Sequence, residues 1–380
     1  MKKALATILA LVMALSVTTM AWADDVAKID GTGYATLQEA VNAANNGQTI
    51  VLQSDVVLTA SLNVAVNKTV TLDLNSYKIT ADMNGPHMIC NAGNLTITDS
   101  SANKTGEIAK IGAETNFGYV IENHGTMTLD RCKISSTSVK SSAIENGWYT
   151  ASANTAGTSC TMTIQNAEVV SVNADGGLYT VKNDDYGVMV INGGVFTNSV
   201  AGAGAVLNWN DLTINGGTFT GASAVRTLKS GSSDFETGKS QIKNGTFNGG
   251  IDTLDGYKTG ITIAVTGGTF STDVTEYLAE GKILQKNGDT YTAVTNSGIT
   301  SGTYTAKPTV PDGYKVVENT DGTFTVEKVG GYYYYQPTTD TTKNDTKGSP
   351  KTFDAGIALY VGMALTSAAG VAFVGKKRED

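Results

Sequence analysis

Two glutamates occupy equivalent places in neighbouring segments of this chain of 380 residues. Glu122 and Glu145 each lie between an isoleucine and an asparagine, in two copies of the tripeptide Ile-Glu-Asn. If the two copies are adjacent parallel strands, equivalent residues are about 4.8 Å apart. Carboxyl groups about 5 to 5.5 Å apart can act as acid and nucleophile in a retaining glycosidase. The pair is therefore the best local candidate for catalysis.

The same pattern also has a structural interpretation. Alternation along a strand turns both glutamates outward, away from the core side on which the neighbouring isoleucines lie. Lys182 takes the equivalent place in a later segment, so the three side chains can form a row of charges on the surface. This interpretation predicts a solvated charge ladder without catalysis.

Aromatic residues near this row are the second group of candidates. Trp148 and Tyr149 follow Asn146 in a long insertion, and Trp209 follows Asn208 in a turn. Exposed aromatic rings in loops can stack on sugar rings. The alternative is that Trp148, Tyr149 and Trp209 pack beneath their own loops.

The three cysteines do not indicate a metal site or a disulfide framework. Cys90, Cys132 and Cys160 lack the close pairing, such as C-x-x-C, that is typical of metal ligands. Each lies among apolar or small residues, so all three are predicted to be small fillers of the core.

The positions of these residues depend on a loose internal repeat. Each copy has a short strand that ends in Asn, a turn, a second strand with alternating apolar residues, and a Gly-rich bend that leads to Phe or Ile. The copies are Met88 to Ile97, Val120 to Ile134, Val181 to Phe196 and Val206 to Phe219. The strand-ending asparagines recur at intervals that vary between 23 and 37 residues, at Asn91, Asn123, Asn146, Asn183 and Asn208. Such a repeat predicts a solenoid of short strands with insertions in its loops.

The repeat resembles the pectate-lyase-like superfamily over roughly residues 48–271. The Gly-rich bends predict that each following Phe points inward and stacks on its counterpart in the next coil. The resemblance implies an all-β, right-handed parallel β-helix with Asn side chains stacked inside it. Many members of this superfamily cleave acidic polysaccharides.

The sequence does not contain the catalytic sets that those relatives use. The lyases hold Ca²⁺ with several acidic residues and abstract a proton with a basic one, but neither Arg131 nor Arg226 has clustered acids beside it in the sequence. Of the hydrolase motifs, only Asn183-Asp184-Asp185 is present in part. Asp184 and Asp185 are therefore weak catalytic candidates, no cofactor is expected, and Ca²⁺ is expected only if the chain is a lyase.

Elements at both ends of the repeat are predicted to close it. Thr36 and Glu39 form a capping-box pattern before a short apolar helix, so residues 24–271 are expected to form a β-helix with an N-terminal capping helix. Residues 272–330 are expected to form a C-terminal cap of one short helix, Val274 to Glu280, and two β-hairpins. The hairpins should turn at Asn287-Gly288 and Asp321-Gly322.

Both ends of the chain carry targeting patterns. Residues 1–23 combine two lysines, an apolar stretch and Ala21-Trp22-Ala23, which predicts a cleaved signal peptide. Residues 331–352 form a low-complexity linker. Residues 355–374 are apolar and precede Lys376, Lys377 and Arg378, as in a membrane span whose basic end stays inside the cell.

The C-terminal end, 353–380, together with the preceding motif Ser349-Pro350-Lys351-Thr352, resembles a sortase-dependent sorting signal. The resemblance implies cleavage after Thr352 and transfer to peptidoglycan on the surface of a Gram-positive bacterium. Ser349 stands where Leu or Asn is usual and Phe353 where Gly is usual, and the alternative is a simple single-pass membrane anchor.

These observations favour a non-catalytic surface protein that binds extracellular glycans or host surfaces. The formal net charge of −8 disfavours nucleic acid as a partner. The alternatives are an anchored polysaccharide lyase or glycoside hydrolase, and a structural component of the wall.

Overall fold

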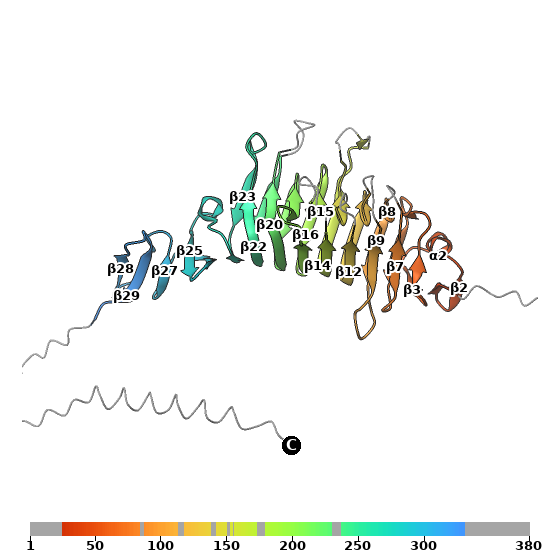
Figure 1. The fold of residues 1–380 in the computed structure, drawn as a ribbon, viewed down its shortest axis with the longest axis horizontal. Helices are drawn as coiled ribbons and strands as arrows, with labels where there is room; N and C mark the ends of the chain where they lie inside the picture. Colours follow the sequence, from red (N-terminus) through yellow and green to blue (C-terminus); the bar gives the residue numbers. More distant parts are fainter. Residues whose placement is uncertain are drawn as a thin grey trace, which may run out of the picture. The chain divides into compact units, whose positions relative to one another are not determined.

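The computed structural model describes residues 25–83, 87–112, 118–137, 142–149, 153–154, 156–172, 179–229 and 237–330 (Figure 1). This part of the chain is nearly all β, and most of its strands belong to one long, mostly parallel sheet. The predicted signal peptide, linker, sorting motif and segment 355–374 lie outside the described residues. Among the described residues, no helix has the length and apolarity needed to cross a bilayer.

The strands form three parallel ladders. The first ladder contains, in order, β3 (Gln48–Leu52), β6 (Thr69–Asp73), β9 (Asn94–Thr98), β12 (Thr126–Ser136), β14 (Cys160–Ser171), β16 (Gly187–Ile191), β19 (Asp211–Ile214), β21 (Lys239–Ile242) and β23 (Thr262–Val265).

The second ladder joins β4 (Val56–Val57), β7 (Lys78–Ala81), β10 (Glu107–Lys110), the second halves of β12 and β14, β17 (Val195–Asn198), the first halves of β20 (Thr218–Thr227) and β22 (Thr246–Asp252), and β24 (Thr269–Phe270). The third joins β5 (Leu62–Val64), β8 (Ile89–Asn91), β11 (Ile121–Asn123), β13 (Ile144–Asn146), β15 (Tyr179–Asn183), β18 (Gly204–Asn208) and the second halves of β20 and β22.

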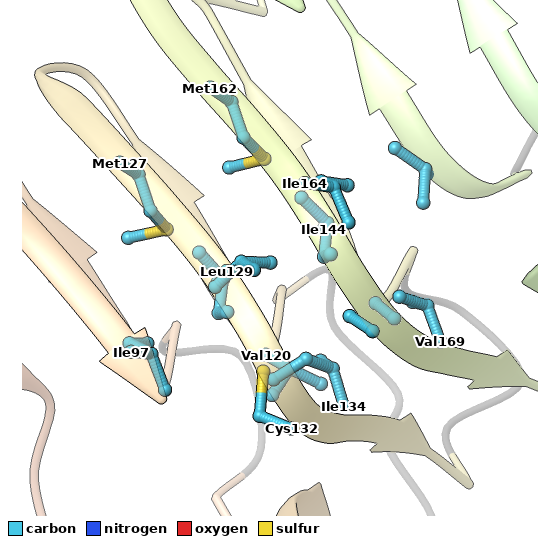
Figure 2. Packing of buried hydrophobic residues seen from close by; sticks show 14 of the residues in the cluster. Ile97, Val120, Met127, Leu129, Cys132, Ile134, Ile144, Met162, Ile164 and Val169 are labelled. Atoms are coloured by element: carbon cyan, nitrogen blue, oxygen red, sulfur yellow. The ribbon is translucent and has the colours of Figure 1, made fainter. Parts of the chain in front are cut away.

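The chain visits the three ladders in strict rotation from β3 to β24, and we call one such circuit a coil. Each strand pairs with the strand one circuit later, which is compatible with a β-solenoid. Apolar residues at equivalent positions stack between coils: Met127 lies in register with Met162, and Leu129 with Ile164 (Figure 2). Alternation along each strand puts these residues on the buried side of the sheet.

Four phenylalanines form a second internal stack, as the bends of the repeat predict. Phe196, Phe219, Phe247 and Phe270 are fully buried, and successive ring centroids are 4.9, 5.0 and 4.9 Å apart. A glycine with positive φ stands two residues before each ring, and a Cβ added at Gly194 would lie 2.3 Å from the carbonyl oxygen of Ala167. The bend therefore requires glycine, which turns the chain so that Phe enters the core.

Buried asparagines form the third stack, and the sequence prediction of this stack is confirmed. The Nδ2 groups of Asn91, Asn123, Asn146 and Asn183 each donate to the Oδ1 of the next asparagine at 2.7 to 2.8 Å, and Asn208 completes the row. Each amide also donates to a backbone carbonyl oxygen of the following coil, such as that of Thr126 or Thr161. We call these five residues the Asn row.

The beginning and end of the ladders differ from the repeat. At the start, β1 (Ala27–Ile29) pairs antiparallel with β2 (Thr32–Tyr34) and with β3. The one α-helix of the described residues, α2 (Leu37–Ala43), has the capping box of Thr36 and Glu39, and Gln38 exchanges hydrogen bonds with the backbone of Asn63 in β5. Leu37, Ala40 and Val41 bury one face of this helix.

At the other end, β24 pairs antiparallel with β26 (Thr290–Thr295). The remaining strands, β25 (Lys282–Asn287), β27 (Gly302–Tyr304), β28 (Tyr314–Glu318) and β29 (Phe324–Lys328), also pair antiparallel. The predicted helix from Val274 to Glu280 is wrong in extent, because only a 3-10 turn, η2 (Thr275–Tyr277), forms. The chain becomes extended at Leu278, which bridges to Val265 of β23 in place of a further helical turn.

We predict that Asn146→Ala lowers the free energy of unfolding by about 2 to 5 kcal/mol. The substitution leaves the Nδ2 group of Asn123 and the Oδ1 of Asn183 buried without their partners, and each costs about 1 to 3 kcal/mol. Urea unfolding followed by circular dichroism measures the change.

Asn192→Ala is the matched control, because Asn192 bridges Gln165 and Asn215 in an exposed amide row. Its expected change is within about 0.5 kcal/mol. Equal effects of the two substitutions would contradict the role assigned to the Asn row.

Candidate functional site

The candidate site lies on the third ladder, at the position just before the Asn row. Because side chains alternate along a strand, this position points to the opposite side of the sheet. Register places there, in successive coils, Cys90, Glu122, Glu145, Lys182, Leu207, Arg226 and Asp252, which we call the polar row. The predicted adjacency of Glu122, Glu145 and Lys182 is confirmed.

Glu122 lies between two histidines. Its Oε1 is 3.2 Å from His87 Nε2 and 3.8 Å from His124 Nε2. The side chain retains 18 % of its exposure, and burial raises its pKa, while a hydrogen bond from the Cys90 thiol acts in the opposite direction. Glu122 is thus a partly accessible carboxyl group with two imidazoles within reach.

The backbone fixes the tautomer of His87. The N–H of Tyr119 donates to His87 Nδ1 at 3.0 Å, so in the neutral ring Nε2 carries the proton and donates to Glu122. The imidazole also stacks on the Tyr119 ring, with centroids 5.1 Å apart. Neutral His87 therefore acts as a donor to Glu122, since its lone pair is already occupied.

His124 stacks on the indole of Trp148, with ring centroids 3.7 Å apart and nearly parallel planes. Burial lowers the pKa of His124 below its usual 6.5, and a backbone hydrogen bond with Gly147 opposes this shift. The ring is therefore mostly neutral at neutral pH.

Glu145 is enclosed with two charged neighbours. Lys182 Nζ lies 2.7 Å from Asp184 Oδ2, 3.6 Å from Glu145 Oε1 and 3.5 Å from the Tyr119 hydroxyl. Burial raises the pKa of Glu145, although the charge of Lys182 partly counters it. Burial disfavours the ammonium of Lys182, but Asp184, Tyr119 and Glu145 together raise its pKa. We call Glu145, Lys182 and Asp184 the buried triad.

The prediction of a solvated charge ladder is therefore wrong for this part of the row. The side chains of Glu145, Lys182 and Asp184 retain only 2, 6 and 7 % of their exposure. Lys182 also lies 5.3 Å from the ring centroid of Tyr149 and 5.7 Å from that of Tyr119. Two aromatic rings thus lie within cation–π distance of the ammonium group.

The aromatic candidates differ in exposure. Tyr149 is 74 % exposed, which makes it an accessible ring beside the polar row. Trp148 is half-buried against His124, and its backbone N–H donates to the carbonyl oxygen of Asp185 at 2.9 Å. Trp209 packs against a small cluster of Tyr179, Leu207 and Leu228, with its ring edge-on to Tyr257.

The remaining candidates from the sequence, Asp185, Arg226 and the three cysteines, lie outside the group around Glu122 or pack in the interior, except for Cys90. Asp185 is buried and forms an isolated bridge with Trp148. Arg226 and Asp252, farther along the polar row, form a two-point ion pair at 2.6 and 3.0 Å.

The cysteines differ in burial. Cys132 packs in the core and Cys160 is buried. Cys90 is only half-buried beside Glu122, so its prediction as a core filler is wrong.

The sequence did not single out His87 and Tyr119 as site residues. Each stands two residues before the first residue of a third-ladder strand, Ile89 of β8 or Ile121 of β11, and this common place in the repeat was the available signal. The described residues contain no group of three or more His, Cys, Asp or Glu side chains arranged to bind a metal ion.

We predict that Trp148 reports the protonation of His124. As pH falls from about 8 to 4, charging His124 places a cation on the indole face and should quench Trp148 emission, with a midpoint below 6.5.

The same protonation affects stability. The folded state binds this proton less tightly than the unfolded state, so charging His124 reduces the free energy of unfolding as pH falls below 6.5.

Fluorescence titration of the Trp209→Phe variant isolates this signal among the described residues. His124→Gln in the same background should remove the transition. A midpoint above 6.5, or a transition that survives His124→Gln, would contradict the assignment.

Comparison with known proteins gave no relative from which a function could be transferred. No protein-family model, curated protein or solved structure matches this chain.

Proposed function

We propose that this chain is a surface-displayed protein that binds extracellular glycans without cleaving them. One observation carries the proposal: the exposed ring of Tyr149 lies 5.3 Å from Lys182 of the polar row and directly follows Trp148, which stacks on His124 near the partly exposed Glu122. An aromatic face covers the C–H groups of a sugar ring, while a carboxylate and imidazoles bond its hydroxyl groups.

The exposure of the carboxyl groups argues against catalysis by the predicted pair. A retaining glycosidase needs both carboxyl groups at the substrate. Glu122 retains access to solvent, whereas Glu145 is enclosed and lies beside Lys182. The raised pKa of Lys182 also keeps it protonated, so its amine is not free to act as a general base. Glu122 is therefore better suited to bind a ligand than to share a reaction with Glu145.

The charges of the site support neutral glycans as its ligands. Carboxyl groups outnumber the single lysine among Glu122, Glu145, Lys182 and Asp184, and Glu122 is the most exposed of the four. A polyuronate would bring further carboxylates to this surface and be repelled. We therefore infer a preference for neutral oligosaccharides over oligogalacturonate.

The finer architecture and the location form part of the same proposal. The rotation of three strands per coil supports a right-handed parallel β-helix, in which α2 serves as the N-terminal cap and β25 to β29 serve as a C-terminal module. The sequence patterns support export by residues 1–23 and attachment to peptidoglycan by a sortase after Thr352. In this arrangement the linker 331–352 separates the glycan site from the wall.

We predict that Tyr149→Ala weakens binding to a neutral oligosaccharide by about tenfold, because losing a stacked ring costs about 1.4 kcal/mol. Calorimetric titration against cellohexaose, xylohexaose, mannohexaose and chitohexaose, with oligogalacturonate as the charged comparison, measures the affinity. Each sugar is also analysed by mass spectrometry after incubation, with and without Ca²⁺.

Tyr257→Ala is the control, because Tyr257 is 42 % exposed but lies beside Trp209. Its affinity should equal that of the unaltered chain. Loss of binding in Tyr257→Ala alone would move the site to Trp209. Cleavage of any sugar would favour the lyase or hydrolase alternative, and failure to bind all five would favour a structural wall component.

A further inference from the structure

The buried triad has a geometry that glycan binding does not explain. Lys182 Nζ is 2.7 Å from Asp184 Oδ2, so the carbon that carries this oxygen is at most one C–O bond farther away. Reacting atoms in a near-attack arrangement are about 3 to 3.5 Å apart. Lys182 and Asp184 lie two residues apart along the chain, and their side chains meet in an enclosed space.

We propose that Lys182 and Asp184 form an intramolecular amide bond, with Glu145 as the group that transfers the proton. The proposal concerns a covalent modification of the chain itself and does not depend on the proposed glycan binding.

The reaction balances without any further reactant. A proton passes from the Lys182 ammonium to the Asp184 carboxylate, which gives a neutral amine and a carboxylic acid. Nζ then attacks the carboxyl carbon of Asp184, and the new C–N bond uses the nitrogen lone pair. Glu145 accepts a second proton from Nζ and delivers it to Oδ2. The C–Oδ2 bond breaks, its electron pair leaves with the oxygen, and one water molecule is released.

Each step has a group in place. The backbone N–H of Asp185 donates to Asp184 Oδ1 at 3.2 Å, which is the oxygen that would carry negative charge in the tetrahedral intermediate. Glu145 Oε1 lies 3.6 Å from Nζ and has no hydrogen-bond partner in the described residues. Burial raises the pKa of Glu145, so its carboxyl group can hold and release a proton near neutral pH.

Enclosure favours the reaction in two ways. Burying two opposite charges away from water has a desolvation cost. The neutral amine and acid do not have this cost, and formation of the amide removes both charges permanently. Exclusion of water also opposes hydrolysis of the product. Because the pKa of Lys182 is raised, the neutral amine is a minor species, and the bond should form slowly after folding.

An exposed pair in the same molecule provides an internal comparison. Lys258 Nζ lies 2.8 Å from Asp255 Oδ1, nearly the same distance as in the buried triad, but these side chains are 61 and 96 % exposed. In the described ion pairs Lys258 contacts Asp255 alone, whereas Lys182 contacts both Asp184 and Glu145. If distance alone were sufficient, both pairs would react.

The test is the mass of the purified full chain after several days at room temperature. We expect a species lighter by one water molecule than the mass calculated from the sequence. Trypsin should fail to cut after Lys182 in this species and release one fragment from Ser141 to Arg226. A succinimide at an aspartate also loses water but leaves Lys182 open to trypsin, so cleavage after Lys182 distinguishes the two products.

Three variants separate chemistry from folding. Lys182→Arg and Glu145→Gln should retain full mass, while Asp184→Asn should lose ammonia in place of water. The fragment with Lys258 should be unmodified in all samples. A folded, unaltered chain that retains full mass and is cut after Lys182 would overturn the proposal, as would equal water loss in Glu145→Gln.

Discussion

The hydrogen bonds of the Asn row are the interaction on which the candidate site depends. Each buried amide bonds the asparagine of the next coil and a backbone carbonyl oxygen of that coil. A shift of one residue in any strand would break these bonds and bury the wrong set of side chains. The row therefore fixes the register of the third ladder, and with it the side chain that each coil contributes to the polar row.

Because of this constraint, neighbouring positions of one strand have different roles: the asparagine fixes the register, and the residue before it contributes to the polar row. The asparagine recurs in the five successive coils from β8 to β18, whereas the preceding residue changes from Cys90 to Glu122, Glu145 and Lys182. Loops of different length enter and leave the third ladder without altering its register. Tyr119 and Tyr149 come from such connections, and they convert part of a surface row into an enclosed group of charges.

The sequence predicted the repeating features well because they follow from local rules. The asparagines, the Gly-x-Phe bends and the equivalent places of Glu122 and Glu145 recur along the chain, and the stacks and registers follow directly. The surroundings of Lys182 could not be predicted in this way, since Tyr119 and Tyr149, whose rings lie beside its ammonium group, come from connections that do not repeat. The failed helix at Val274 has a similar cause, because pairing of Leu278 with β23 outweighs a weak local preference.

The two ends of the ladders determine whether copies of this chain can join one another. A parallel ladder that ends in an unpaired strand is a template for another molecule, and repeated addition produces fibres. Here β3 is paired antiparallel with β1 and β24 with β26, while α2 bonds β5 and Leu278 bridges to β23. These contacts occupy the outer edges of β3, β23 and β24. A strand from another copy therefore cannot add to the ladders at these positions, which opposes growth into fibres.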